Sequence, residues 1–219
     1  MNINVNNYIS KWLLCEERRI NNNVIINMEL AGINLSINPN VFLPDPKITH
    51  STSLLLKSIE KNALNGKEVL DLGTGSGFFA IYSSLKGAAS VVATDIDKNI
   101  LKQASNNALT NKVTNIEFIE SNVFDNVEGL YDYIFVNGPI SNQAWSESKS
   151  GGHSIASYGE ALFSQYRNHL KPDGQMLMTF SEIGPVNSFY ETLKVYKVKY
   201  DELREDKFGI WWGVYRISR

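Results

Sequence analysis

The sequence predicts an α/β fold with an open, mostly parallel sheet that ends in an antiparallel hairpin. Residues 68–85 pass from an apolar run through a glycine-rich turn into a helical pattern, and residues 90–94 form a second strand that ends in an acid. Successive strand–turn–helix units are typical of open α/β sheets. Residues 195–203 and 208–217 alternate around the short turn 204–207, so these two strands must be antiparallel.

The glycine-rich turn is the clearest candidate ligand site. It runs from Asp71 to Gly77, reads DLGTGSG, and follows a strand at the end where such sheets bind ligands. Glycine leaves no Cβ between the backbone and a ligand. A dinucleotide site needs its third glycine one position later, where the chain has a phenylalanine, and an acid at position 71 would repel a phosphate but suit a cationic ligand.

This turn resembles the first motif of the class I S-adenosylmethionine-dependent methyltransferases, which have a Rossmann-like fold. The resemblance implies S-adenosyl-L-methionine as the cofactor. It assigns these loop residues to cofactor binding: Asp71, Gly73, Thr74, Gly75 and Gly77.

The ends of the next two strands complete the expected cofactor site. Asp95 ends the second strand, where a carboxylate can accept hydrogen bonds from both ribose hydroxyls of an adenosine. We assign Ile96 to the same site, and we expect Asp97 to cap the following helix. In the family, the corner after the third strand holds the adenine, and Asn122 and Val123 stand at the matching positions.

A second motif follows the fourth strand, residues 131–136. The stretch from Asp132 to Ile140, DYIFVNGPI, resembles the D-x-x-x-x-N-P-P-Y motif of methyltransferases that act on planar nitrogens. The resemblance implies that the Asn137 oxygen and a following backbone carbonyl hold the N–H groups of the acceptor, and we assign Asn137 and Pro139 to catalysis. Asn137 would also border the cofactor. Gly138 and Ile140 depart from the motif, and Asn-Gly-Pro also forms turns that bind nothing.

We divide the chain into a short N-terminal extension, residues 1–45, and a main methyltransferase domain, residues 46–219. The extension is expected to hold a helix over 8–17 and a hairpin from 24–29 and 33–37. By resemblance, Phe42 and Pro44 would line the reactive pocket. The other expected elements are helices over 54–64, 98–109, 155–170 and 185–193, strands over 115–119 and 175–180, a turn at 171–174 and a substrate loop at 141–152.

Composition limits the classes of function. The net charge of −2 offers no overall basic surface for phosphate-dominated binding of nucleic acid. The single cysteine excludes an intramolecular disulfide and a cysteine-cluster zinc site, and we expect no metal. No apolar run approaches the ~18 residues of a membrane span, so we expect a soluble, cytoplasmic protein without a membrane partner.

The sequence therefore predicts an S-adenosylmethionine-dependent methyltransferase that N-methylates a planar amide or amine. The acceptor stays open between a protein glutamine, a base of RNA or DNA, and a small molecule, and the oligomeric state is also open. Two other classes remain: a non-catalytic S-adenosylmethionine-binding protein and a nicotinamide-dependent oxidoreductase.

Overall fold

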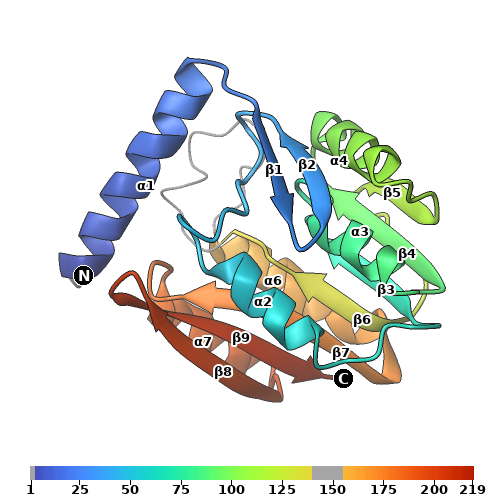
Figure 1. Cartoon of the computed structure of the whole chain (residues 1–219). Coiled ribbons are helices and arrows are strands. Elements are labelled where there is room, and N and C mark those ends of the chain that lie inside the picture. The colour runs from blue at the N-terminus through green and yellow to red at the C-terminus, as the bar shows by residue number, and fades with distance from the viewer. Residues whose placement is uncertain (1–2, 140–154) are drawn as a thin grey trace.

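The computed structural model describes residues 3–139 and 155–219, and in this part of the chain the predicted α/β fold is confirmed (Figure 1). One sheet has the strand order β5-β4-β3-β6-β7-β9-β8, and β9 runs antiparallel to both of its neighbours. Its strands are β3 (Glu68–Leu72), β4 (Ser90–Asp95), β5 (Ile116–Glu120), β6 (Tyr131–Val136), β7 (Leu170–Ser181), β8 (Tyr200–Lys207) and β9 (Ile210–Ser218).

Helices cover both faces of this sheet. In Figure 1, α2 lies in front of the sheet, while α6 and α7 pack together behind it. The helices are α1 (Ile3–Asn21), α2 (Ser51–Ile59), α3 (Phe78–Leu85), α4 (Lys98–Thr110), α6 (Ile155–Gln165) and α7 (Val186–Val195), with a 3₁₀ turn η1 (Tyr166–Asn168). Because both faces are covered, the central strands β3 and β6 are mostly apolar and mostly buried.

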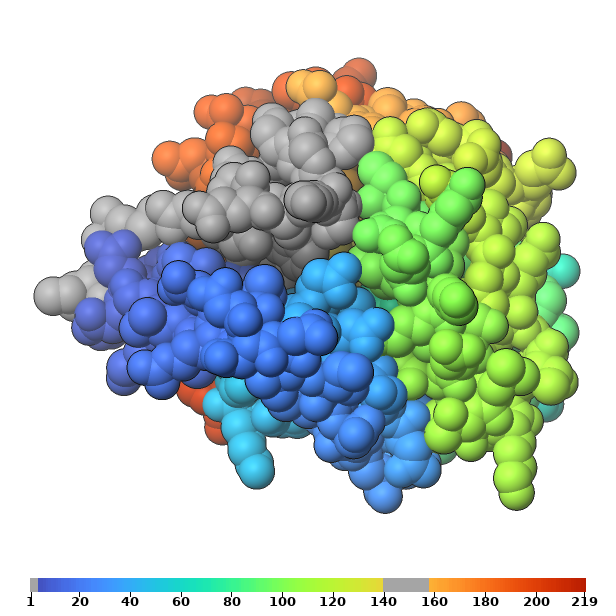
Figure 2. All heavy atoms as spheres, turned by 90° about the horizontal axis from the view of Figure 1, so that it is seen from above, coloured from blue at the N-terminus to red at the C-terminus, as the bar shows by residue number. Residues whose placement is uncertain are grey.

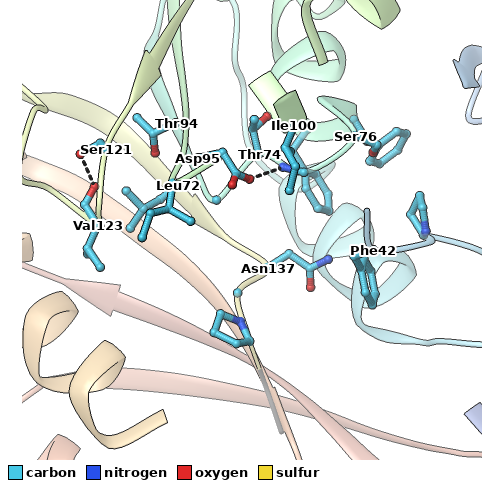
Figure 3. A pocket seen from close by; sticks show the side chains of 18 of the residues that line it. Phe42, Leu72, Thr74, Ser76, Thr94, Asp95, Ile100, Ser121, Val123 and Asn137 are labelled. Carbon is cyan, nitrogen blue, oxygen red and sulfur yellow. Dashed lines mark hydrogen bonds between the residues drawn. The ribbon is translucent and has the colours of Figure 1, made fainter. Parts of the chain in front are cut away.

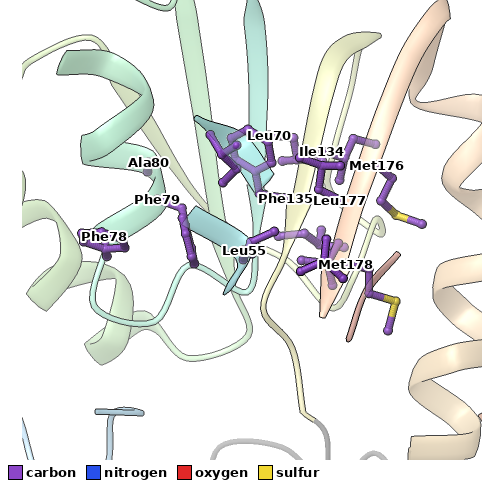
Figure 4. Packing of buried hydrophobic residues seen from close by; sticks show 14 of the residues in the cluster. Leu55, Leu70, Phe78, Phe79, Ala80, Ile134, Phe135, Met176, Leu177 and Met178 are labelled. Carbon is purple, nitrogen blue, oxygen red and sulfur yellow. The ribbon is translucent and has the colours of Figure 1, made fainter. Parts of the chain in front are cut away.

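The hydrophobic core lies along the central strands (Figure 4). Leu70 of β3, Ile134 of β6 and Met176 of β7 are fully buried on three neighbouring strands. Phe79 of α3 and Leu55 of α2 pack into the same cluster. This packing fixes the carboxyl ends of β3, β4 and β6 relative to one another, and those ends carry the predicted site.

The C-terminal hairpin differs from the prediction in its turn. The turn was expected at residues 204–207, but β8 continues to Lys207 and only Phe208 and Gly209 form the turn, with φ of +59° and +76°. Two residues at positive φ give a turn whose twist matches that of the flanking strands. Most of β8 is exposed. Because its last residues are charged, the sequence analysis predicted a turn there in place of a strand.

Other boundaries also differ from the prediction. The expected turn at 171–174 lies inside β7, where the pairing with β6 shifts between the pairs Tyr131–Leu170 and Tyr133–Gln175. Gly174 fits there because a Cβ would stand 2.6 Å from the Tyr131 carbonyl oxygen. Helices α1 and α2 begin earlier than expected, at Ile3 and Ser51.

At the other end of the central strands, where β3, β6 and β7 begin, one carboxylate joins the three strands. Asp132 accepts hydrogen bonds from Lys171 Nζ at 2.7 Å, the Glu68 backbone N–H at 2.9 Å and Lys67 Nζ at 3.1 Å. Partial desolvation raises the pKa of Asp132, but these three donors outweigh it and lower the pKa to about 2. The carboxylate therefore ties three strands together at neutral pH.

The N-terminal segment is built as expected from a helix and a hairpin, β1 (Ile26–Leu30) and β2 (Ile33–Ile37). The inward residues of β2 belong to the same buried cluster as the sheet. Arg19 of α1 donates to the backbone oxygens of Asn38 and Val41, at 2.9 and 2.7 Å, and so fixes the chain that leaves the hairpin. No helix in the described part of the chain is long and apolar enough to cross a membrane.

Candidate active site

A cavity opens at the carboxyl ends of β3, β4 and β6 (Figure 3). All of the predicted site residues except Asp71 and Gly77 line it: Gly73, Thr74, Gly75, Asp95, Ile96, Asn122, Val123, Asn137 and Pro139. The segment that leads into α2 adds the expected wall residues Phe42 and Pro44. Thus these residues, from five separate segments of the sequence, meet at one cavity, where open α/β sheets bind their ligands.

The glycine loop presents bare backbone to this cavity. Gly75 has a φ of +53°, and a Cβ built there would meet nothing within 4 Å, so its face of the loop is open. Gly77 has another function. It begins α3 with a φ of +84°, and a Cβ would lie 3.1 Å from the Ala104 Cβ of α4. Gly77 therefore allows close packing of the loop on α4 and does not line the cavity.

Asp71 lies behind the loop, with 1% of its surface exposed. Its Oδ2 atom accepts hydrogen bonds from Thr74 Oγ1 at 2.7 Å and from the Ala80 N–H at 3.1 Å. Burial raises the pKa of Asp71 to about 7. The sequence led us to expect this carboxyl group against the ligand, but in the structure it shapes the loop from inside.

Asp95 faces the cavity. Its Oδ2 accepts the Gly75 N–H at 3.1 Å and its Oδ1 accepts the Asp97 N–H at 3.3 Å, and burial raises its pKa. A carboxylate has about four lone-pair sites, so each oxygen of Asp95 can accept a further hydrogen bond from a diol. Asp97 caps α4 as expected, because its Oδ1 accepts the Asn99 N–H at 2.7 Å.

The corner after β5 has an unusual backbone. Val123 has a φ of +52°, which is a strained conformation for a β-branched residue. The Ser121 hydroxyl supports it by donating to the Val123 carbonyl at 3.0 Å and by accepting the Asn126 N–H at 3.0 Å. Both Asn122 and Val123 line the cavity. Strain of this kind often accompanies a binding site.

Asn137 is held by two threonines that the sequence gave no reason to select. Its Oδ1 accepts the Thr179 hydroxyl at 2.8 Å, and its Nδ2 donates to Thr52 Oγ1 at 3.2 Å. Both threonines are 1% exposed. Figure 3 shows the Asn137 side chain pointing toward Phe42 across the cavity. The amide is fixed from β7 and α2, and its carbonyl oxygen keeps a second lone pair for a ligand.

Tyr158 of α6 is another lining residue that the sequence analysis missed. Its hydroxyl is buried and has no hydrogen-bond partner among the described residues. Burial raises the pKa of Tyr158, so the hydroxyl stays protonated and can donate. A Cβ at Gly138 would lie 2.7 Å from this hydroxyl, so the glycine makes room for the tyrosine. Ile140 and the expected substrate loop, residues 141–152, lie outside the described residues.

The sheet order, the glycine loop and the acid at the end of β4 define a class I, Rossmann-like methyltransferase. The chain belongs to the methyltransferase small domain family, whose family model matches residues 32–208. This assignment makes it an S-adenosylmethionine-dependent enzyme. It decides among the three classes considered from the sequence in favour of the methyltransferase.

Two curated relatives and one solved structure support this assignment. The chain is 30% identical over 194 residues to a putative protein N5-glutamine methyltransferase of Methanocaldococcus jannaschii, a match that covers 80% of this chain and 95% of the relative. It is 31% identical over 172 residues to a release factor glutamine methyltransferase of Lactococcus lactis, covering 71% and 60%. A 16S rRNA N2 methyltransferase of T. thermophilus, solved with AdoMet and guanosine, shares the fold with a TM-score of 0.69 at 18% identity, covering 90% and 50%.

Proposed function

We propose that this enzyme methylates a planar nitrogen held by Asn137, and that a glutamine side-chain amide of a protein is the favoured acceptor. The observation that carries this proposal is the fixed Asn137 amide, which two buried threonines hold at the rim of the cavity. Two relatives at 30% and 31% identity are named for glutamine methylation, and this supports the choice of acceptor.

The chemistry explains why a fixed amide is useful. The lone pair of an amide or aryl amine nitrogen is delocalised, so the nitrogen is a poor nucleophile unless its N–H groups are held in one orientation. S-adenosylmethionine, when bound, supplies an electrophilic methyl group on a positively charged sulfur. Asn137 Oδ1 and the Gly138 carbonyl are the acceptors that can hold the two N–H groups, and orientation of this kind supplies much of the rate.

The cavity residues also fit the adenosine part of the cofactor. Asp95 can also accept from the ribose hydroxyls, because a carboxylate has about four lone-pair sites and the backbone N–H groups around it do not use all of them. Asn122 and Val123 offer a polar side chain and a strained backbone corner for the base. The open face at Gly75 leaves room for the remainder of the cofactor.

Substitution of Asn137 tests the proposal. Asn137→Ala removes the acceptor oxygen, and we expect turnover to fall by about 10²–10³-fold, as when one preorganised hydrogen-bonding group is removed. Affinity for S-adenosylhomocysteine, measured by calorimetry, should change by less than about threefold (under 0.7 kcal/mol). Thr179→Val is the matched control. It keeps the Asn137 oxygen but removes one support, so its loss of turnover should be smaller.

The acceptor is identified by product analysis. Glutamine, asparagine and lysine peptides and the four ribonucleosides are incubated with labelled S-adenosylmethionine, and the methylated atom is located by mass spectrometry. We expect transfer to the glutamine amide nitrogen. Transfer to carbon or to the deprotonated amine of a lysine, or full turnover by Asn137→Ala, would contradict the proposal.

A further inference from the structure

We infer that Asn107 of α4 is a positioning residue for the cofactor site, because it ties the glycine loop to the N-terminal hairpin. Asn107 does not line the cavity, and it is 2% exposed. Figure 2 shows the hairpin segment (blue) lying directly against the α4 segment (green) on one face of the molecule. The inference concerns cofactor binding and does not depend on the identity of the methyl acceptor.

The contact between α4 and β2 is a ladder of amide side chains. Asn111 exchanges hydrogen bonds with the backbone of Asn34, with its Oδ1 accepting at 2.9 Å and its Nδ2 donating at 2.8 Å. Asn107 does the same with Ser36, at 2.9 and 3.1 Å. Gln103 continues the ladder by accepting the Asn38 N–H at 3.2 Å and donating to the Ser36 carbonyl at 2.6 Å.

The spacing of this ladder has a simple geometric basis. Four helical residues rise about 6 Å, and two strand residues rise about 6.6 Å. Side chains four apart on one helix face therefore meet every second backbone unit of a strand. The helix completes the open edge of β2, which would otherwise present unpaired N–H and C=O groups.

Asn107 differs from its two neighbours in the ladder because it also reaches the glycine loop. Its Nδ2 donates to the Ser76 carbonyl at 2.8 Å, in addition to the Ser36 carbonyl. Ser76 lines the cavity, and Gly77 beside it packs on Ala104 one turn earlier in the same helix. One buried amide thus links the hairpin and the loop through both of its N–H groups.

This link controls two walls of the cavity at once. On one side, the Ser76 carbonyl sets the orientation of the loop that carries Gly75 and its hydrogen bond to Asp95. On the other side, the chain that leaves β2 supplies Asn40 and Phe42 to the lining. Loss of Asn107 should let these walls shift relative to each other, while loss of Asn111 should loosen only the hairpin.

The test compares Asn107→Ala with Asn111→Ala, two truncations in the same ladder. Calorimetry with S-adenosylhomocysteine is run where thermal unfolding shows each variant to be fully folded. We expect Asn107→Ala to weaken affinity at least fivefold more than Asn111→Ala does, although both lower the melting temperature. Any smaller difference would overturn the inference, because equal losses would mean that the ladder only stabilises the hairpin.

Wild-type protein provides a second measurement, which decides the question if Asn107→Ala fails to fold. Coupling between two sites is reciprocal. Saturating S-adenosylhomocysteine should therefore slow hydrogen exchange at the Ser36 backbone N–H, which donates to Asn107 Oδ1. Exchange at the Asn34 backbone N–H, which donates to Asn111 Oδ1, should slow less. Equal slowing at both amides, or none at Ser36, would overturn the inference.

Discussion

The two ends of the central strands shift the pKa values of their carboxylates in opposite directions. Where β3 and β6 begin, Asp132 accepts three hydrogen bonds, two of them from lysines, and its pKa is lowered to about 2. Where β3 and β4 end, neither Asp71 nor Asp95 has a cationic partner among the described residues, and burial raises the pKa of both. One sheet therefore has an end that stabilises the fold and an end that is destabilised by its own charges.

This difference indicates what each end is for. A buried carboxylate without a positive partner opposes folding, because desolvation disfavours the charged form. Groups of this kind persist where a ligand supplies the missing partner, and perturbed pKa values therefore gather at functional sites. In this protein the ligand is a sulfonium compound with a ribose, whose hydroxyl groups can donate to Asp95, while Asp71 supports the loop from behind the cavity. The end with Asp132 needs no ligand because its donors belong to the fold.

The largest effect is expected at Asp95. Asp95→Ala removes the acceptor for the ribose hydroxyls, and hydrogen bonds to a charged group contribute about 1.5–3 kcal/mol each. Affinity for S-adenosylhomocysteine should therefore fall at least about 10²-fold. The unliganded protein should lose little stability, because a desolvated charge is removed as well. Calorimetry and urea unfolding measure the two quantities separately. A large loss of stability with unchanged affinity would reverse the assignment of this end of the sheet.

Asp71 gives the next largest effect, which appears in the pH dependence of stability. Its pKa is raised from 3.8 to about 7 in the folded protein, so the folded state binds a proton that the unfolded state releases, and stability falls as the pH rises between these values. The expected decrease from pH 5 to pH 7 is about 2 kcal/mol. Asp71→Asn can still accept from Thr74 and Ala80 through one oxygen, and it should lack this decrease.

Urea unfolding of wild type and Asp71→Asn at several pH values measures this contribution, because the other titrating groups are common to both proteins. The difference in stability between the two should change by about 2 kcal/mol over that range. Parallel curves would mean that Asp71 stays ionised in the folded protein. The contrast between the two ends of the sheet would then rest on Asp95 alone.

Local patterns in the sequence were sufficient to place strands β3 and β4, the glycine loop and Asp95, because strand, turn and acid follow one another within a few residues. The sequence could not show which way Asp71 points, since the strand that carries it is buried on both faces. Thr52 and Thr179 escaped notice because they reach Asn137 from 85 and 42 residues away. Contacts of that range depend on the assembled fold.

The stabilising end of the sheet gives a smaller effect. Asp132→Ala removes three hydrogen bonds from a partly exposed carboxylate, and we expect a loss of about 1 kcal/mol. Its pKa is depressed in the folded protein, so this stabilisation is present at neutral pH and is lost as the pH falls from about 4 toward 2. Affinity for S-adenosylhomocysteine should not change. A loss of affinity would show that the two ends are coupled through β3 and β6.

Tyr158 provides the smallest and most discriminating comparison. Its hydroxyl has no partner among the described residues, whereas the Tyr215 hydroxyl donates to Glu202 at 2.8 Å. A buried hydroxyl without a partner opposes folding, and one with a partner contributes about 1 kcal/mol. In the unliganded protein, Tyr158→Phe should leave stability unchanged or raise it by less than about 1 kcal/mol, while Tyr215→Phe should lower it.

Urea unfolding of the two variants at neutral pH measures this difference. A loss of more than about 1 kcal/mol in Tyr158→Phe would mean that the fold itself uses this hydroxyl. The Tyr158 hydroxyl would then stabilise the fold, as Asp132 does, and would not be a group kept for the ligand, as Asp95 is. The expected result places Tyr158 at the ligand end of the sheet, beside the Gly138 turn, as a buried hydroxyl without a partner among the described residues.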